Sequence, residues 1–289
     1  MASQSSELVW LITGTSTGLG KSLALAALAR GDKVIATARG RSFAKLEDLK
    51  QNGAAVLELD VTSPLETLQE AAKVAVAIYG RIDVLVNNAG YILVGTVEEA
   101  TPKETLDQFN TNVFGALNVS RAFLPYMREK KTGKIIWTGS IGGWMGSPYC
   151  GLYCATKWTL RGISRSLDKE ITPLGLRSIC VDFGYFRTSF LNADQRSPPV
   201  SKIADYREIS QAIESSLQAY NGNQPGDPEK GVQILLDIAH GTGAFSNNDL
   251  PESLALGSDA YDLITASIRD DASNIEKWKD VTQSTDFDA

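Results

Sequence analysis

Histidine and cysteine are scarce in this chain, which has one histidine and three cysteines among its 289 residues. Cys150, Cys154 and Cys180 form no C-x-x-C pair and leave one thiol over, so we expect packing residues in a reducing compartment, the cytoplasm, rather than disulfides. A histidine-bearing metal cluster or a Ser-His-Asp triad would have to use His240 alone. We therefore expect a structural histidine and no metal site.

Positive charge and long apolar runs are lacking as well. The formal net charge is −6 and the basic residues form no run, so the chain is a poor candidate for binding nucleic acid or anionic lipid. The first residues, MASQSSE, are polar, and the apolar run LVWLI stops at a glycine loop, so neither a signal peptide nor a membrane span is predicted. The composition, 43% hydrophobic, is that of an ordinary globular protein.

Short apolar segments alternate with helix-like segments along the chain, a pattern typical of parallel βαβ units. The expected strands are ELVWLIT, KVIATA, AAVLELD, RIDVLVNNAG, GKIIWTGS, LRSICVDFG and LPESLALG. Helices are expected at roughly 64–79, 102–130 and 150–173, and after the Asp227-Pro228-Glu229 start signal. We predict an α/β fold: one doubly wound (Rossmann) domain over residues 1–289, with a parallel sheet of about seven strands and helices on both faces. Residues from about 280 to 289 are polar and are expected to form a loose tail.

The segment from about 189 to 227 interrupts this alternation. It begins with the loop-like SFLNADQRSPPVS and continues with apolar residues at helical spacing: Ile203, Tyr206, Ile209, Ile213, Leu217 and Tyr220. Two interpretations stay open, a surface helix packed on the sheet and a lid. The lid is attractive because an insertion after the sixth strand lies at the carboxyl edge of the sheet, where open α/β folds bind ligands.

A glycine-rich loop, TGTSTGLG at residues 13–20, joins the first strand to the first helix. Such a turn lets the backbone and the helix N-terminus approach a pyrophosphate. About twenty residues further, where a carboxylate would bind the ribose of NAD, the chain has Arg39 and Arg41. A guanidinium can bind a 2′-phosphate, so the predicted cofactor is NADP(H). The alternative is that both arginines are solvated loop residues.

Several patterns follow one another in a specific order: the glycine loop, NNAG at 87–90, Asn112, Ser140, and YCATK at 153–157. On these patterns the chain resembles the short-chain dehydrogenase/reductase family from about residue 8 to 268. The T-A-R, F-G-Y-F-R-T and L-G-S-D-A stretches are similar to the branch that includes hydroxysteroid and retinol dehydrogenases and microbial ketoreductases. Phe183 is a departure, because such proteins usually have proline at this place.

The resemblance implies a role for each matching residue. Asn112 would hold a proton-relay water and Ser140 would bind the substrate oxygen. Tyr153 would be the acid/base, with Lys157 as its partner. The residues implied to line the cofactor are Gly14, Thr15, Ser16, Gly18, Leu19, Gly20, Asp60, Val61, Asn87, Ala89, Gly90, Tyr153, Lys157, Gly184 and Thr188, to which the charge argument adds Arg39. Asp32 and Asp83 have no place in this pattern and are interpreted as ordinary turn acids.

Similar proteins also pair their long helices across a two-fold axis. We therefore expect a homodimer or homotetramer. Apolar helix faces that exceed what one sheet can cover would form the contact between copies, for example the face with Leu160, Ile163, Leu167 and Ile171.

A phenol and an ammonium four residues apart suit carbonyl reduction. Tyr153 would be protonated at neutral pH and would donate to the developing alkoxide. In the reverse direction, Lys157 and the oxidised nicotinamide would lower the tyrosine pKa by about three units, about 4 kcal/mol. The expectation is an NADP(H)-dependent carbonyl reductase or alcohol dehydrogenase.

Aromatic residues near the motifs predict an apolar pocket for a steroid-, terpenoid- or polyketide-like carbonyl or alcohol. Its predicted members are Ser140, Trp144, Tyr149, Tyr185, Phe186 and Phe190. The aromatic residues after the sixth strand could equally belong to the core. Two other functions stay open: a non-catalytic NADP(H)-sensing regulator, and a non-redox lyase or epimerase that uses the same tyrosine.

Overall fold

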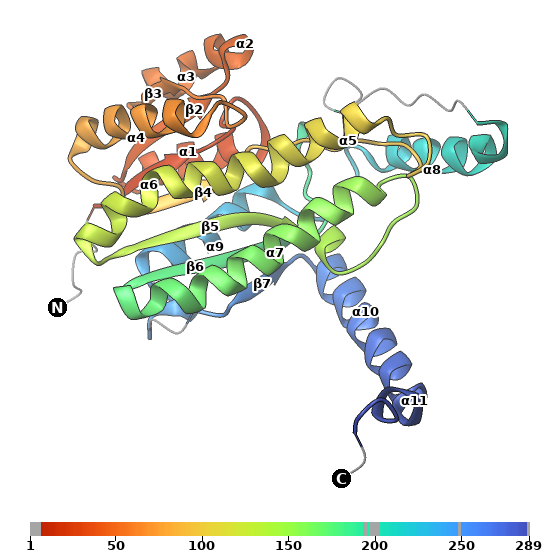
Figure 1. Cartoon of the computed structure of the whole chain (residues 1–289). Helices are drawn as coiled ribbons and strands as arrows, with labels where there is room; N and C mark the ends of the chain where they lie inside the picture. The colour runs from red at the N-terminus through yellow and green to blue at the C-terminus, as the bar shows by residue number, and fades with distance from the viewer. Residues whose placement is uncertain (1–6, 193–195, 197–202, 248–249, 288–289) are drawn as a thin grey trace.

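A parallel sheet of seven strands in the order β3-β2-β1-β4-β5-β6-β7 forms the centre of the computed structural model, which describes residues 7–192, 196, 203–247 and 250–287 (Figure 1). The strands are β1 Val9–Ile12, β2 Lys33–Ala38, β3 Ala55–Glu58, β4 Val84–Asn87, β5 Gly133–Ser140, β6 Leu176–Phe183 and β7 Ser253–Leu256. The expected strands and the doubly wound α/β fold are confirmed. All pairs are parallel, so the strands end at one common edge.

Helices cover both faces of this sheet. On one face α1 (Gly18–Ala29) and α9 (Pro228–His240) enclose a core to which Trp10 and Ile12 of β1 belong. On the other face α4 (Leu65–Tyr79), α6 (Ala116–Lys130) and α7 (Gly151–Ile171) enclose a second core, to which Val9 and Leu11 belong. Alternate residues of one strand thus serve two cores. Two short helices, α2 (Gly40–Phe43) and α3 (Glu47–Gln51), follow β2.

The helix predicted over 102–130 is divided into three parts. α5 (Pro102–Phe109) begins with a capping box between Thr101 and Glu104. A π-helical turn over Asn110–Gly115 then separates α5 from α6 and contains Asn112. Such wide turns are rare and are frequently found at functional sites.

The C-terminal helices lie apart from the sheet. α10 (Ser258–Lys277) buries only Ala260 and Ile264 among its residues and leads away from the sheet to α11 (Lys279–Gln283) (Figure 1). The expected loose tail therefore starts with a short helix, because the helical conformation continues past Lys277 almost without a break. No described helix is both long enough and apolar enough to cross a bilayer.

Two buried carboxylates hold the first strand, which corrects the interpretation of Asp32 and Asp83 as ordinary turn acids. Asp32 accepts hydrogen bonds from the Leu8 N–H (3.0 Å) and the Trp10 indole (2.9 Å), and lies 2.7 Å from Nε2 of His240. Asp83 accepts from the Val9 N–H at 2.9 Å and pairs with Arg81 and Lys130. The single histidine is therefore part of a structural contact between β1, β2 and α9.

Asp32→Ala is expected to lower the free energy of unfolding by about 3 kcal/mol, because the buried Trp10 indole N–H and the partly buried Leu8 N–H would lose their acceptor. Urea unfolding at pH 7 measures this value. Asp270→Ala, which removes an exposed carboxylate of α10, is the matched control and is expected to change stability little. Equal costs for the two variants would contradict the role of Asp32.

Candidate active site

The glycine turn after β1 lies against the end of β4 with no space for larger residues. Gly14 has φ +70°, and a Cβ placed on it would lie 2.8 Å from the Ala89 Cα. A Cβ on Gly20 would lie 2.4 Å from the Asn88 side-chain nitrogen. α1 begins at Gly18, and Thr17 makes no side-chain cap bond to its first turn, so backbone N–H groups point to the edge of the sheet. This geometry fits a pyrophosphate group.

Two residues that sequence reasoning passed over hold this turn in place. The Asn88 side chain donates to the carbonyl oxygens of Thr13 (2.8 Å) and Gly14 (3.0 Å). The Thr13 hydroxyl accepts from the N–H groups of Asn88 and Ala89, both at 3.0 Å. The NNAG pattern contains Asn88, so it was the available signal. Thr15 bonds through both its N–H and its hydroxyl to the Thr37 carbonyl and is buried, while Ser16 and Leu19 are partly exposed.

The predicted adenosine side lies at the ends of β2 and β3. Arg39 is exposed at the start of α2 and interacts electrostatically with Arg41, Asp60 and Tyr91. Asp60 accepts hydrogen bonds from the N–H (2.9 Å) and hydroxyl (2.7 Å) of Thr62. The Val61 carbonyl lies against Gly115 in the π-helical turn.

The turn after β6 lies beside the glycine loop although Phe183 replaces the usual proline. The Gly184 N–H donates to the Leu256 carbonyl at 2.9 Å, and the Tyr185 N–H donates to Asp259 at 2.7 Å. These two bonds hold the turn where proline is usual. A Cβ on Gly18 would lie 3.8 Å from the Thr188 Cβ, so Thr188 lies next to the glycine loop, and its role toward the cofactor stays a prediction. The hollow between them is lined by Gly18, Lys21, Ser22, Leu25, Arg187, Thr188, Ser189, Pro228 and Glu229.

Ser140, Tyr153 and Lys157 come together at the carboxyl end of β5. Ser140 ends that strand, and the other two lie one turn apart on α7. Burial raises the pKa of Tyr153 above its ordinary value of 10.0, although a hydrogen bond with Ser140 lowers it. Burial outweighs the hydrogen bond, so the phenol of the protein alone is protonated at neutral pH. The lowering of this pKa by Lys157 together with the oxidised nicotinamide stays a prediction.

The Lys157 ammonium is buried and directed into the sheet. Its Nζ donates to the Thr138 carbonyl at 2.7 Å and lies 5.5 Å from the centre of the Tyr153 ring. Burial lowers its pKa to about 8. Lys157 is consequently charged below that pH and neutral above it.

Asn112 connects the loop after β4 to α7. Its side chain exchanges two hydrogen bonds with the backbone of Tyr91, at 3.1 and 2.9 Å, and donates to the Thr156 hydroxyl at 3.3 Å. That hydroxyl in turn donates to the Tyr153 carbonyl at 2.6 Å. Asn112 is therefore linked to the backbone of α7 at Tyr153, and its role in holding a water stays a prediction.

The remaining NNAG residues lie close to this connection. Asn87 donates to Ser120 at 2.8 Å, and its buried side-chain oxygen has no partner among the described residues. A Cβ on Gly90 would lie 3.1 Å from the Asn112 side-chain oxygen, so glycine fits this place best.

Aromatic residues next to Tyr153 form an apolar cluster under α8 (Arg207–Tyr220). Tyr149, Tyr185 and Phe190 belong to it, and Tyr185 meets Tyr220 of α8 edge to face at 4.9 Å. α8 thus packs on the site rather than on the sheet, which favours the lid interpretation. Ile209, expected on its apolar face, is 42% exposed. Residues 193–195 and 197–202 of the predicted lid lie outside the described residues.

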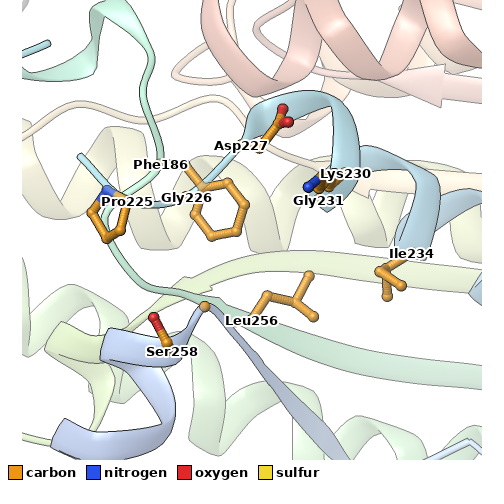
Figure 2. Close-up of a pocket in the computed structure, with 10 residues that line it drawn as sticks. Phe186, Pro225, Gly226, Asp227, Lys230, Gly231, Ile234, Leu256 and Ser258 are labelled. Carbon is orange, nitrogen blue, oxygen red and sulfur yellow. The ribbon is translucent and has the colours of Figure 1, made fainter. Parts of the chain in front are cut away.

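Trp144 and Phe186 are not brought into this cluster. The Trp144 indole donates to Asp182 at 2.8 Å and packs beside Ile264 of α10. Phe186 meets Phe183 edge to face at 5.1 Å and lines a separate hollow near the start of α9, with Pro225, Gly226, Asp227, Lys230, Gly231, Ile234, Leu256, Gly257 and Ser258 (Figure 2). Neighbouring residues of the loop after β6 point to different sides, so Tyr185 reaches the cluster and Phe186 does not.

The helix face expected to contact another copy of the chain is buried in part. Leu160 and Ile171 are buried in the core under α7, and Ile163 and Leu167 are partly buried against that core. The exposed large apolar residues of this region are Leu106, Phe114 and Trp158.

The chain is similar to known proteins in sequence and in fold. The family model described as short chain dehydrogenase matches residues 8–198. Oxidoreductase BOA17 of Botryotinia fuckeliana is 32% identical over 281 residues, which cover 95% of this chain and 97% of that protein. 17-beta-hydroxysteroid dehydrogenase type 1 of Homo sapiens is 32% identical over 247 residues, covering 79% and 73%. The solved structure of a short-chain dehydrogenase from Streptomyces avermitilis matches at TM-score 0.87 and 35% identity, covering 99% of this chain and all of that one.

Gly20→Ala is expected to weaken nicotinamide nucleotide binding at least about tenfold, because the added methyl group displaces Asn88 and opens the glycine turn. Nucleotide affinity is measured by fluorescence titration. Gly162→Ala places the same methyl group in open space on α7 and is the control. Unchanged affinity in Gly20→Ala would show that the turn does not hold the nucleotide.

Proposed function

The chain belongs to the short chain dehydrogenase family and is an oxidoreductase that uses a nicotinamide cofactor, and on this premise we propose that it reduces an apolar ketone or aldehyde with NADPH. The observation that carries the proposal is the Ser140–Tyr153–Lys157 group at the edge of the aromatic cluster. The reverse reaction, oxidation of the alcohol, uses the same groups.

In this proposal Ser140 binds the carbonyl oxygen and Tyr153 donates its proton to that oxygen. The bound cofactor supplies the hydride to the carbonyl carbon. Tyr153 suits proton donation because burial keeps its phenol protonated at neutral pH. The nearby Lys157 ammonium stabilises the tyrosinate that remains until a proton returns from solvent. One oxygen and one carbon thus receive a proton and a hydride, which converts the carbonyl to an alcohol.

Preference for NADPH rests on the end of β2. Ala38, at the end of that strand, has no carboxylate to bind a ribose hydroxyl, and the exposed Arg39 and Arg41 follow directly. Their guanidinium groups suit a 2′-phosphate, which they can bind with charge-assisted hydrogen bonds. Asp60 interacts electrostatically with Arg39 and also accepts two hydrogen bonds from Thr62.

An apolar substrate is supported by the cluster beside Tyr153. It contains Tyr149, Tyr185 and Phe190, together with Ile213, Leu217 and Tyr220 of α8. The similarity to a hydroxysteroid dehydrogenase is consistent with a substrate of this kind. We further propose that the protein acts as a homodimer or homotetramer through the exposed Leu106, Phe114 and Trp158, and works in the cytoplasm, where its free cysteines would stay reduced.

Tyr153→Phe is expected to abolish turnover while NADPH affinity stays within a few-fold, because only the proton donor is lost. NADPH absorbance with a panel of ketones, aldehydes, quinones and steroid- or terpenoid-like carbonyls measures turnover. Normal turnover in the variant would refute the role of Tyr153. NADPH binding without consumption by the unmodified protein on any carbonyl would instead favour a sensor or a non-redox enzyme.

Arg39→Ala is expected to raise the KM for NADPH by about 10- to 100-fold through loss of a charge-assisted hydrogen bond, and to leave the KM for NADH nearly unchanged. Steady-state kinetics with both cofactors decide this, and Arg41→Ala in parallel separates the two arginines. A loss that is equal for both cofactors would mean that neither guanidinium recognises the 2′-phosphate.

A further inference from the structure

Asp182 of β6 is a fully buried carboxylate that takes no part in the proposed reaction. Successive residues of a strand point to opposite faces, so Asp182 shares a face with Cys180, two residues earlier. Cys180 belongs to the core under α7, together with Leu160 of that helix. The Asp182 carboxylate therefore lies between the sheet and the helix that carries Tyr153 and Lys157.

A glycine on the neighbouring strand makes room for this carboxylate. Gly139 pairs with Asp182 in the register of β5 and β6. A Cβ on Gly139 would lie 2.0 Å from the Asp182 Oδ1 and 2.6 Å from the Cys180 Sγ. Asp182 thus reaches over β5 directly beside Thr138, whose carbonyl accepts the Lys157 ammonium at 2.7 Å. The Asp182 carboxylate and the Lys157 ammonium therefore contact β5 at two adjacent residues, Gly139 and Thr138.

The hydrogen bonds to Asp182 come from neutral donors. The Trp144 indole N–H donates to Oδ2 at 2.8 Å, and the Cys180 thiol donates to Oδ1 at 3.3 Å. Arg161, one turn after Lys157 on α7, stacks its guanidinium on the Trp144 ring at 3.2 Å and donates to the Gly143 carbonyl. Burial raises the pKa of the Asp182 carboxyl, whereas the hydrogen bonds from Trp144 and Cys180 and the charge of Arg161 lower it and so favour the charged form.

We propose that Asp182 is a positioning residue for Lys157: its buried negative charge keeps the lysine protonated and directed at Thr138, next to Tyr153. This inference rests on the proposed function, since only a proton donor such as Tyr153 needs a charged lysine beside it. A buried ammonium loses its proton readily unless an anion shares its pocket. In agreement, burial lowers the pKa of Lys157 to about 8, while Cys180 and Asp182 act in the opposite direction.

The surroundings of Lys157 contain few other ionisable groups. Among the described residues, α7 contributes Tyr153 and Arg161, β6 contributes Cys180 and Asp182, and β5 contributes the neutral Thr138 carbonyl. Burial raises the pKa values of Cys180 and Tyr153, which keeps both uncharged near neutral pH. Asp182 is therefore the anion on which the protonation of Lys157 depends.

The test is a pH titration of the Lys157 side chain in the Asp182→Asn variant. NMR of protein labelled with ¹³C at the lysine Cε monitors the titration, and the Lys157→Met variant assigns the Lys157 signal. The midpoint, near pH 8 in the unmodified protein, is expected to fall by about one pH unit when the opposite charge is removed. The alkaline limb of kcat/KM for carbonyl reduction is expected to move equally, with activity at pH 6 within a few-fold of normal.

Ser178→Ala is the matched structural control. Ser178 is equally buried on the same face of β6 and bonds to Trp137, but it carries no charge, so stability is expected to fall while the Lys157 midpoint stays in place. If Asp182→Asn does not fold, Asp182→Ser is used instead. It removes the same carboxylate, and the Lys157 midpoint is again expected to fall.

An unchanged Lys157 midpoint in whichever of these two variants is measured would overturn the role of Asp182. Different observations would refute the proposed function. They are the absence of carbonyl-dependent NADPH oxidation in the unmodified protein, or normal turnover in the Tyr153→Phe variant. The NMR titration needs neither cofactor nor substrate, so it decides the role of Asp182 in either case.

Discussion

The close approach of the β1–α1 turn to the end of β4 is the constraint on which the site depends. Two glycines, Gly14 and Gly20, bring the backbone against Ala89 and Asn88, where any side chain would collide. The approach aligns the first turn of α1 with the carboxyl edge of the sheet, and the bonds between Asn88 and Thr13 hold it there. Because parallel strands all end at this edge, Ser140 and the loop after β6 come to the same place.

Much of this arrangement was predictable because it follows from short-range patterns. Seven apolar segments separated by helices specify a parallel sheet, and glycines between a strand and a helix specify a phosphate-type turn. Tyr153 and Lys157 share a helix face simply through their spacing. The position of Tyr153 and Lys157 beside Ser140 follows once β5 and α7 are recognised as consecutive elements.

The buried carboxylates could not be identified in the same way. Asp32 looks like a turn residue until His240, 208 positions away, is seen to lie against it. Asp182 lies within an apolar strand. Its hydrogen-bond donor Trp144 and the nearby charge of Arg161 come from other elements. The orientation of the aromatic residues in the loop after β6 could not be predicted either. Tyr185 and Phe186 are neighbours in the sequence, but they belong to different clusters in the folded chain. The pKa of Tyr153 depends on burial, which no local pattern reports.

The π-helical turn at Asn110–Gly115 has a consequence for chain length. A π turn contains one residue more than the α-helical turn it replaces. Deleting one residue there would restore a regular helix and rotate α5 by about 100° relative to α6. Asn112 could then not bond both Tyr91 and Thr156. Substitutions within the turn are therefore easier to accommodate than insertions or deletions, and we expect aligned homologues to carry their gaps outside residues 110–115.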